Sequence, residues 1–479
     1  MPQNSEVIVK RSILTTIATV ALALFACGEA TAQTEVSIQS GAIDGMVEGE
    51  VISWKGIPFA APPVGDLRWR APQPAVQWEG VRQTTEYGHD CMQLPFPSDA
   101  APLGNTPAED CLYLNVWKPA PADGPLPVIF WIYGGGFVNG GTSPPTYSGA
   151  ELAKKGVLVV SANYRLGRFG TFAHPQLTEI DADSGLLGNY ALLDQIAALK
   201  WVQGNVAAFG GDPGNVTIVG ESAGGFAVQV LMTSPMARDL FARAVIMSGG
   251  DGSAPPVTRR DTERAGLAFA AYRGIAADDP EALAKLRALD ADAITDGLNI
   301  DTMFHQYEAG GLAPGFPDGR ILVDTGQAFA EGAFAHVPVM VGATADDIGG
   351  KTGEMVAGAR SFSAMLAAQG VPVYAYRFSY VPESLSGQGA WHATDIPFFF
   401  DTQAIKYGPA TTPRDNAMGR TISAYLVNFA KSGNPNGTGL PSWPRYEKSS
   451  DVIMDFTATG TAMPQTDPLA EILDAIARR

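Results

Sequence analysis

The sequence predicts an α/β fold in which helices lie on both faces of a mostly parallel central sheet. Residues 127–133 and 157–162 are continuous apolar runs, a pattern typical of strands that are buried on both faces. Residues 192–209 and 414–431 have the spacing of helices instead. Because strand and helix patterns alternate through the centre of the chain, we expect a doubly wound sheet.

The other elements follow in chain order from local composition. Residues 36–43 and 48–54 are expected to form the two strands of one hairpin, with its turn at 44–45. Residues 58–74 contain too many prolines for regular structure, and 253–310 are alanine-rich and mostly helical. Further strands are expected at 216–219, 244–247, 337–342 and 373–380, and a further helix at 226–232.

The composition describes an acidic globular protein with a large core. Of its 479 residues, 46% are hydrophobic and 17% are charged. The formal net charge is −17 and the basic residues are not clustered, so nucleic acid is not expected as a partner. The sequence contains no internal repeat and gives no indication of an oligomeric state.

The first 32 residues are predicted to be an export signal. Lys10 and Arg11 precede an apolar stretch, 13–26, that is too short to cross a bilayer as a helix. Small residues at 30–32 then fit a cleavage site. Cleavage there would leave residues 33–479, which we expect to be a single periplasmic or secreted domain.

Cys27 offers an alternative fate for this N-terminal segment. Residues 24–28 resemble a bacterial lipobox, in which Cys27 would be lipidated and would anchor the mature protein to a membrane. Phe25 is unusual at its position in such a motif, which favours soluble export. A membrane is therefore expected as a partner only if Cys27 is lipidated.

Cleavage after residue 32 would leave two cysteines, Cys91 and Cys111. In an exported chain two cysteines most simply form one disulfide, here closing a loop of about 20 residues. Two buried thiols are the alternative, which an oxidising compartment disfavours.

A Gly-x-Ser-x-Gly motif at 220–224 is the most informative part of the sequence. The strand expected at 216–219 leads into it, and the helix expected at 226–232 follows it. This order is that of the nucleophile elbow of an α/β-hydrolase, a sharp turn that exposes a serine oxygen above the sheet. Its glycines are needed because a Cβ atom would clash in such a bend. Ser222 is therefore the candidate nucleophile.

A serine hydroxyl becomes a good nucleophile only when a base removes its proton, and a carboxylate must orient that base. In this fold the acid and then the histidine follow the serine along the chain. His392 meets these conditions best. The strand expected at 337–342 ends just before Asp346 and Asp347, where catalytic groups lie in open sheets. His336 has no such acid between it and the serine. The other histidines precede the serine or lie far from a later strand end, and they are His89, His174 and His305.

Backbone N–H groups must stabilise the negative charge that develops during acyl transfer. Glycines 134–136 directly follow the strand expected at 127–133 and can supply such groups, as can Ala223. A phosphate-binding loop is the alternative for these glycines, but no Lys-Ser or Lys-Thr pair follows them. A calcium-loop pattern from Asp290 fails because Ile294 offers no side-chain oxygen. We therefore expect neither a metal nor an organic cofactor.

Motifs distributed over most of the chain carry a family resemblance. They are WKGIPFA at 54–60, RWRAP at 68–72, EDCLYLNVW at 109–117, NYRLG at 163–167, FGGDP at 209–213 and NFAKSGNPN at 428–436. Together with the elbow, they resemble the type B carboxylesterase/lipase family, the esterase branch that includes the cholinesterases. The resemblance covers nearly all of residues 36–456 and implies an α/β-hydrolase fold.

The resemblance also implies roles for individual residues. Matched position by position, it implies Ser222 as nucleophile, His392 as base and Asp347 as acid, with Asp346 as a minor alternative to Asp347. It implies a Cys91–Cys111 disulfide as well. The implied oxyanion donors are Gly135, Gly136 and Ala223, and the implied supporting residues near the triad are Glu221 and Ser248.

Three departures from the family pattern bear on the substrate. Asp347 stands where Glu is usual, and Ile348 stands where Gly is usual. His392 follows Asp347 by only 45 positions, so we expect a reduced helical cap and a more open or differently lidded site. No tryptophan lies between Cys91 and Cys111 to hold a quaternary ammonium by cation–π contact, so choline esters are not expected.

We therefore expect a secreted serine esterase that acts through an acyl-enzyme on small-molecule esters, with short-chain or bulky esters favoured over long-chain triglycerides. A non-catalytic binding protein is one alternative, which the presence of a complete triad disfavours. An acyltransferase that uses the same triad is another, which product analysis in added alcohol would separate. The aromatic residues that could line an apolar acyl site are Phe137, Phe226, Phe304, Phe316, Trp391 and Phe398.

Overall fold

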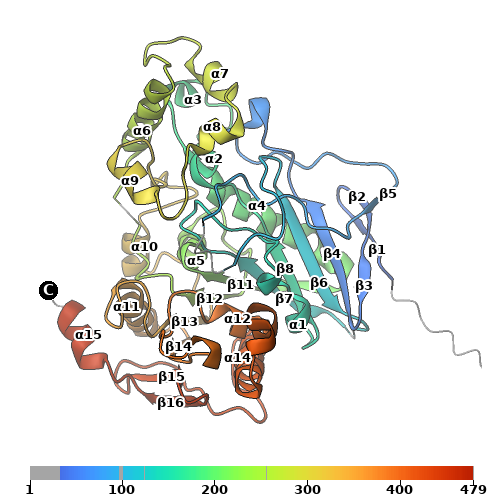
Figure 1. The fold of residues 1–479 in the computed structure, drawn as a ribbon, viewed down its shortest axis with the longest axis vertical. Helices are drawn as coiled ribbons and strands as arrows, with labels where there is room; N and C mark the ends of the chain where they lie inside the picture. Colours follow the sequence, from blue (N-terminus) through green and yellow to red (C-terminus); the bar gives the residue numbers. More distant parts are fainter. Residues whose placement is uncertain (1–32, 97–100, 123, 255, 478–479) are drawn as a thin grey trace, which may run out of the picture. The chain divides into compact units, whose positions relative to one another are not determined.

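A computed structural model of the chain describes residues 33–477 except 97–100, 123 and 255, and within them it has a central mixed sheet of 11 strands (Figure 1). The inner strands are parallel and lie in the order β15-β14-β13-β12-β11-β7-β8. Their bounds are β7 Leu126–Ile132, β8 Leu158–Ala162, β11 Gly211–Glu221, β12 Arg243–Met247, β13 Val339–Thr344, β14 Val373–Phe378 and β15 Val452–Phe456. The outer strands pair antiparallel, and they are β16 Ala462–Thr466, β6 Tyr113–Pro119, β4 Val51–Pro58 and β3 Met46–Glu48.

The predicted α/β class with a mostly parallel sheet is confirmed. All residues of β8 and β13 are buried, as the continuous apolar runs in the sequence require of strands covered on both faces. The larger helices that cover the sheet are α4 Tyr190–Asn205, α5 Ala223–Thr233, α11 Glu354–Ala368 and α14 Pro413–Ser432. The region predicted as mostly helical contains α6 Arg259–Tyr272, α7 Ala282–Arg287, α8 Ala291–Thr295 and α9 Met303–Glu308.

Shorter elements complete the described chain. The short helices are α1 Ala150–Ala153, α2 Gly167–Gly170, α3 Pro175–Ile180, α10 Thr325–Glu331, α12 Ile396–Phe399, α13 Gln403–Tyr407 and α15 Ala470–Ala477. Small sheets are formed by β1 Glu35–Ile38 with β2 Gly41–Asp44 and β5 Val81–Gln83, and by β9 Thr171–Phe172 with β10 Gly188–Asn189. No helix in the described ranges is long and apolar enough to cross a membrane. The predicted export signal, including Cys27, lies outside the described residues.

The prediction of a single N-terminal hairpin is wrong. The chain turns already at residues 39–40, so that β1 pairs with β2 in one small sheet. After Gly45 the chain enters the central sheet, where β3 pairs with β4. A side chain at Gly45 would overlap the carbonyl of Ser53, so this glycine permits the close crossing that divides one expected hairpin into two.

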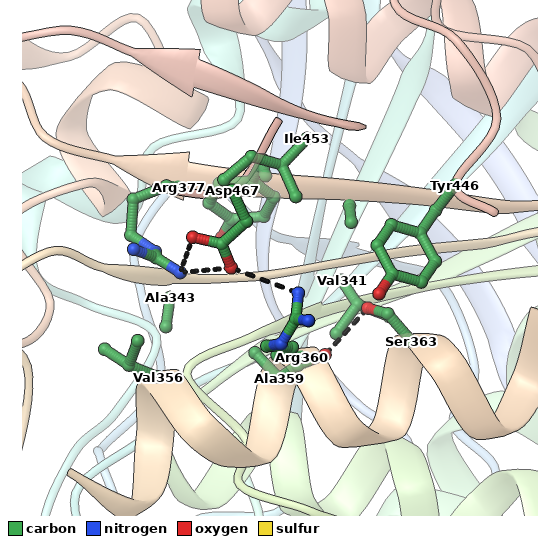
Figure 2. A pocket seen from close by; sticks show the side chains of 12 residues that line it. Val341, Ala343, Val356, Ala359, Arg360, Ser363, Arg377, Tyr446, Ile453 and Asp467 are labelled. Carbon is green, nitrogen blue, oxygen red and sulfur yellow. Dashed lines mark hydrogen bonds and ion pairs between the residues drawn. The ribbon is translucent and has the colours of Figure 1, made fainter. Parts of the chain in front are cut away.

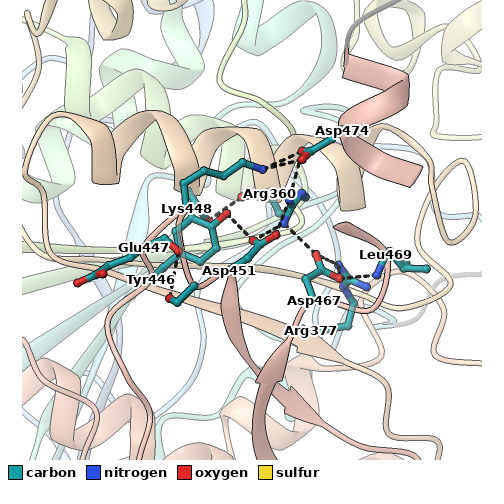
Figure 3. A network of polar contacts seen from close by, with 12 residues as sticks. Arg360, Arg377, Tyr446, Glu447, Lys448, Asp451, Asp467, Leu469 and Asp474 are labelled. Atoms are coloured by element: carbon teal, nitrogen blue, oxygen red, sulfur yellow. Dashed lines mark hydrogen bonds and ion pairs between the residues drawn. The ribbon is translucent and has the colours of Figure 1, made fainter. Parts of the chain in front are cut away.

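A network of ion pairs fixes α11 to the C-terminal part of the chain (Figure 3). Arg360 on α11 donates to Asp451 at 2.5 and 2.6 Å, to Asp467 at 3.4 Å and to Asp474 at 3.2 Å. Arg377 on β14 also donates to Asp467, at 3.2 Å. Because Arg360 and Asp467 are buried, salt screens their attraction little.

A small space lies beside this network, between α11 and the sheet (Figure 2). Its volume is about 10 Å³, and Arg360, Asp467 and Tyr446 are among the residues that line it. A space of this size holds one water molecule at most. We therefore regard it as part of the packing around α11 and not as a ligand site.

Candidate active site

Four neighbouring parallel strands bring polar residues to one edge of the sheet. Ser222 directly follows β11, and Ser248 directly follows β12. Asp347 lies three residues beyond β13, and His392 lies in the loop after β14. Since the carboxyl ends of parallel strands meet at the same edge, residues that are far apart in sequence meet here.

Ser222 occupies a strained turn between β11 and α5. Its backbone has φ 55° and ψ −123°, a conformation that residues other than glycine rarely adopt. A Cβ atom at Gly220 would overlap the carbonyl of Gly224, and one at Gly224 would overlap the carbonyl of Ile132. The two motif glycines are therefore required by backbone contact, as the elbow predicts.

The three candidate triad side chains form one chain of hydrogen bonds. The Oγ atom of Ser222 is 2.8 Å from Nε2 of His392. On the other side of the ring, Nδ1 of His392 is 2.6 Å from Oδ1 of Asp347. Such an arrangement holds the proton of the neutral ring on Nδ1 and directs the lone pair of Nε2 toward the serine.

Asp347 is almost completely buried and accepts further hydrogen bonds. Ser248 Oγ donates to it at 2.6 Å, Thr344 donates from its hydroxyl at 2.8 Å and from its N–H at 3.1 Å, and the N–H of Ile348 donates at 2.7 Å. Burial by itself raises the pKa of Asp347, but the hydrogen bonds from His392 and these donors outweigh it, so the pKa is lowered. Asp347 therefore remains ionised at neutral pH.

Asp346 contacts the histidine loop rather than the histidine ring. Its Oδ2 accepts from the N–H of Ala390 at 2.9 Å, and its own N–H donates to the carbonyl of Ala390 at 3.0 Å. Lys351 is 3.9 Å from its other carboxylate oxygen. Of the two adjacent acids, Asp347 thus contacts the ring of His392, whereas Asp346 binds the backbone of Ala390, two residues before His392.

Glu221 is buried beside the imidazole. Its Oε1 is 3.3 Å from Nε2 of His392, within ion-pair distance but without hydrogen-bond geometry. Burial raises the pKa of Glu221 to about 8. Burial lowers the pKa of His392, but Glu221 and then Asp347 raise it more, to about 9. Since a protonated Glu221 no longer attracts the imidazolium, proton uptake by Glu221 moves the pKa of His392 back down.

A second buried acid, Asp395, lies near the triad. Its Oδ2 accepts from the hydroxyl of Tyr376 at 3.1 Å. Burial, and after it the charge of Asp347, raise the pKa of Asp395 to about 7. Glu221 and Asp395 thus have raised pKa values, whereas the pKa of Asp347 is lowered. The negative charge near His392 is therefore concentrated on Asp347.

The loop after β7 contains the candidate oxyanion donors. Gly135 and Gly136 have φ values of 100° and 63°, and among the described residues their N–H groups have no hydrogen-bond acceptor. Ala223 begins α5, where backbone N–H groups have no partner within the helix. Asn139 fixes the end of this loop, because its Oδ1 accepts from the N–H of Ile300 at 2.8 Å.

A cavity of about 720 Å³ opens at Ser222 and His392, and all three candidate oxyanion donors line it. Phe137, Phe226 and Phe304 line it as expected. The other three expected aromatic residues do not: Phe316 and Phe398 are buried in the protein, and the side chain of Trp391 is 55% exposed to solvent. Their neighbours along the chain gave no signal of which way each ring faces.

The remaining predicted features are placed as follows. Cys91 and Cys111 form a disulfide. His174 caps α3, His89 and His336 contact backbone carbonyls, and His305 is exposed beside Glu308, so His392 is the described histidine that lines the cavity. Asp290 caps α8 by accepting from the N–H of Ala293. No cluster of metal-ligating side chains occurs among the residues that the structure describes.

The sequence interpretation missed three residues that act on the site. Thr344 donates twice to Asp347, Asn139 ties the oxyanion loop to Ile300, and Asp395 is buried next to the triad. Thr344 was detectable as the last residue of a strand that precedes an acid. Asn139 and Asp395 gave no comparable signal, because their partners lie far away in the sequence.

Comparisons with known proteins identify the family to which the chain is similar. The sequence model of the carboxylesterase family matches residues 32–356 and 351–471. The fumonisin B1 esterase of Sphingopyxis macrogoltabida is 35% identical, over 88% of this chain and 86% of that protein. The para-nitrobenzyl esterase of Bacillus subtilis is 34% identical, over 90% of this chain and 97% of that protein. A solved PNB esterase structure matches with a TM-score of 0.81 at 31% identity, and covers 92% of this chain and 98% of that chain.

The fold and these relatives define a hydrolase of carboxylic esters. The chain belongs to the carboxylesterase family. The family resemblance and the α/β-hydrolase fold that the sequence predicts are both confirmed.

Proposed function

We propose that the chain is an exported serine carboxylesterase whose catalytic triad is Ser222, His392 and Asp347. The observation that carries the proposal is the continuous hydrogen-bond chain from Ser222 Oγ through both ring nitrogens of His392 to Asp347, at 2.8 and 2.6 Å. These distances lie within the reach that proton transfer requires. At its Ser222 end, this series of hydrogen bonds opens into a cavity that can admit an ester.

In the acylation half-reaction, Oγ of Ser222 forms a bond to the carbonyl carbon of the ester while Nε2 of His392 takes its proton. The carbonyl oxygen becomes an oxyanion, which the N–H groups of Gly135, Gly136 and Ala223 stabilise. The oxyanion collapses, the bond to the alcohol oxygen breaks, and the imidazolium gives its proton to that oxygen. The products of this half-reaction are a free alcohol and an acylated Ser222.

Deacylation repeats the same steps with water. Nε2 of His392 takes a proton from a water molecule, whose oxygen bonds to the acyl carbon. Collapse of the second oxyanion breaks the bond to Ser222 Oγ, which regains the proton from His392. Asp347 keeps its charge throughout and stabilises the imidazolium in both half-reactions.

We infer a preference for short-chain or bulky esters. The cavity volume of about 720 Å³ is within the range of sites that hold small organic molecules, and its walls are largely apolar. The sequence separation of 45 positions from Asp347 to His392 leaves little chain for an additional lid beyond α11. Faster hydrolysis of emulsified long-chain lipid than of soluble esters would contradict this preference.

We also propose export to the periplasm or the medium. The charged and apolar pattern of residues 1–32 supports it, and so does the Cys91–Cys111 pair, since disulfides persist in oxidising compartments. Mass spectrometry of the mature N-terminus separates the two fates of the leader. A chain that begins at Gln33 supports soluble export, whereas a lipidated N-terminal Cys27 supports a membrane anchor.

The decisive experiment compares residues 33–479 with their Ser222→Ala variant on p-nitrophenyl acetate. We expect the wild type to release p-nitrophenolate and the variant to lose at least about 10³-fold in kcat, since the nucleophile is absent. A stoichiometric acyl adduct on Ser222, detected by mass spectrometry after rapid quenching, supports the covalent route. Unchanged activity in the variant would exclude Ser222 as the nucleophile.

A further inference from the structure

The cavity at Ser222 has an unbalanced charge. Its lining includes two carboxylates, Glu221 and Glu354, and no described lysine or arginine lines it. Burial raises the pKa of Glu221, so Glu221 is mostly protonated at neutral pH. Glu354 is exposed to solvent and places its carboxylate at the cavity wall.

Basic side chains near the cavity do not offset this charge. Arg168 is buried, and its guanidinium donates to the backbone carbonyl of Gly311 at 2.9 Å and to the side-chain Oε1 of Gln306 at 2.8 Å. It also donates to the backbone carbonyls of Ile294 and Thr295. Lys351 lies close to Glu354 in sequence, but its Nζ is 3.9 Å from the carboxylate of Asp346 and its side chain is largely in solvent. Among the described residues, His392 is thus the one side chain on the cavity wall that can carry a positive charge, and Asp347 and Ser222 already occupy its two ring nitrogens.

The position of Glu354 is fixed by the fold. Glu354 is the first residue of α11, and the next residue, Met355, lines the same cavity. Further along the helix, Arg360 is held by three carboxylates, as Figure 3 shows. Because that network anchors α11, the helix presents Glu354 to the cavity at a defined place.

We propose that Glu354 is a specificity-determining residue that disfavours esters with a carboxylate on the acyl group and admits neutral and cationic esters. This inference rests on the proposed esterase function of the same site. A bound carboxylate would lose water on entering a largely apolar cavity and would gain no ion pair with a described lysine or arginine there, while Glu354 repels it. A cationic acyl group would instead be attracted by Glu354 and could lie against the rings of Phe137 and Phe226.

The test uses 4-nitrophenyl esters of equal acyl length that differ in terminal charge. The anionic ester is mono-4-nitrophenyl adipate, the neutral one is its terminal amide, and the cationic one carries a trimethylammonio group on a hexanoyl chain. kcat/KM is measured for each with the wild type, Glu354→Gln and Glu354→Lys. The matched control is Glu471→Lys, since Glu471 is also exposed in the first turn of a helix but is not among the residues that line the cavity.

We expect kcat/KM of the wild type to be roughly tenfold or more higher for the neutral ester than for the anionic one. This ratio of kcat/KM, neutral over anionic, should fall at least about threefold in Glu354→Gln. Glu354→Lys should lower the ratio further, and rising ionic strength should shrink the discrimination of the wild type, as a charge effect requires. Glu471→Lys should leave the ratio unchanged.

Two results would overturn the inference. One is equal kcat/KM for the neutral and anionic esters in the wild type. The other is a neutral-to-anionic ratio of kcat/KM in Glu354→Lys that equals the ratio in the Glu471→Lys control. Activity on the neutral ester that disappears in Ser222→Ala shows that the proposed function stands in either case. A folded wild type that hydrolyses none of the three esters would overturn the proposed function and this inference with it.

Discussion

Replacement of Asp347 by asparagine distinguishes the two adjacent carboxylates at the end of β13. Asparagine has nearly the same size but carries no charge, and its NH₂ group would have to face groups that themselves donate. Ser248, Thr344, Ile348 and His392 all donate to Asp347 in the structure. An NH₂ group turned toward His392 would favour the tautomer with its proton on Nε2, which cannot accept the proton of the serine.

We expect Asp347→Asn to lower kcat about 10³- to 10⁴-fold, which corresponds to roughly 4 to 5.5 kcal/mol of lost transition-state stabilisation. KM should change little, because Asp347 is not among the described residues that line the cavity. The assay is p-nitrophenyl acetate hydrolysis between pH 5 and 10, as initial rates. Thermal unfolding of each variant should be measured in parallel, since a buried mismatched amide costs about 1–3 kcal/mol of stability.

The pH profile gives a second, independent readout. Ser222 is activated by neutral His392, so activity rises with pH through the pKa of His392. The carboxylate of Asp347 helps to raise that pKa, and its removal should therefore move the acid limb of kcat/KM to lower pH. The matched control is Asp346→Asn, which should retain activity within about tenfold, because Asp346 contacts Ala390 and not the imidazole. A large loss in Asp346→Asn with near-normal activity in Asp347→Asn would refute the assignment.

Three further predictions concern stability. The raised pKa of Glu221 means that its contribution to stability is complete below its unfolded pKa and is lost as pH rises through about 8. Between pH 5 and pH 9, the free energy of unfolding should therefore decrease less in Glu221→Gln than in the wild type, and urea titrations should show a difference of at least about 1 kcal/mol. The same decrease in both proteins would contradict this. Replacing Cys91 and Cys111 together by serine should lower the free energy of unfolding by about 3 kcal/mol, and equal urea midpoints for this variant and the oxidised wild type would argue against it. Arg360→Met removes one of the positive charges that compensate the buried carboxylate of Asp467, and it should lower the free energy of unfolding by about 3–5 kcal/mol. An unchanged melting temperature would show that the network does not anchor α11.

The sequence by itself determined the fold class, the nucleophile elbow and the short set of candidate acids and bases. Those features leave local signatures in residue type. Strands buried on both faces must be continuously apolar, and the backbone contacts of Gly220 and Gly224 admit no side chain. With five histidines in the chain, the order serine, acid, histidine was enough to single out His392.

Only the tertiary structure decided which side chains meet. Asp346 and Asp347 are adjacent and chemically identical, and the path of the chain after β13 turns one toward Ala390 and the other toward His392. The same limit explains why Phe398, expected in the acyl site, is buried in the core, and why Asn139 was overlooked. Their partners come from segments far away in the sequence, and the direction of a side chain depends on that packing rather than on its neighbours along the chain.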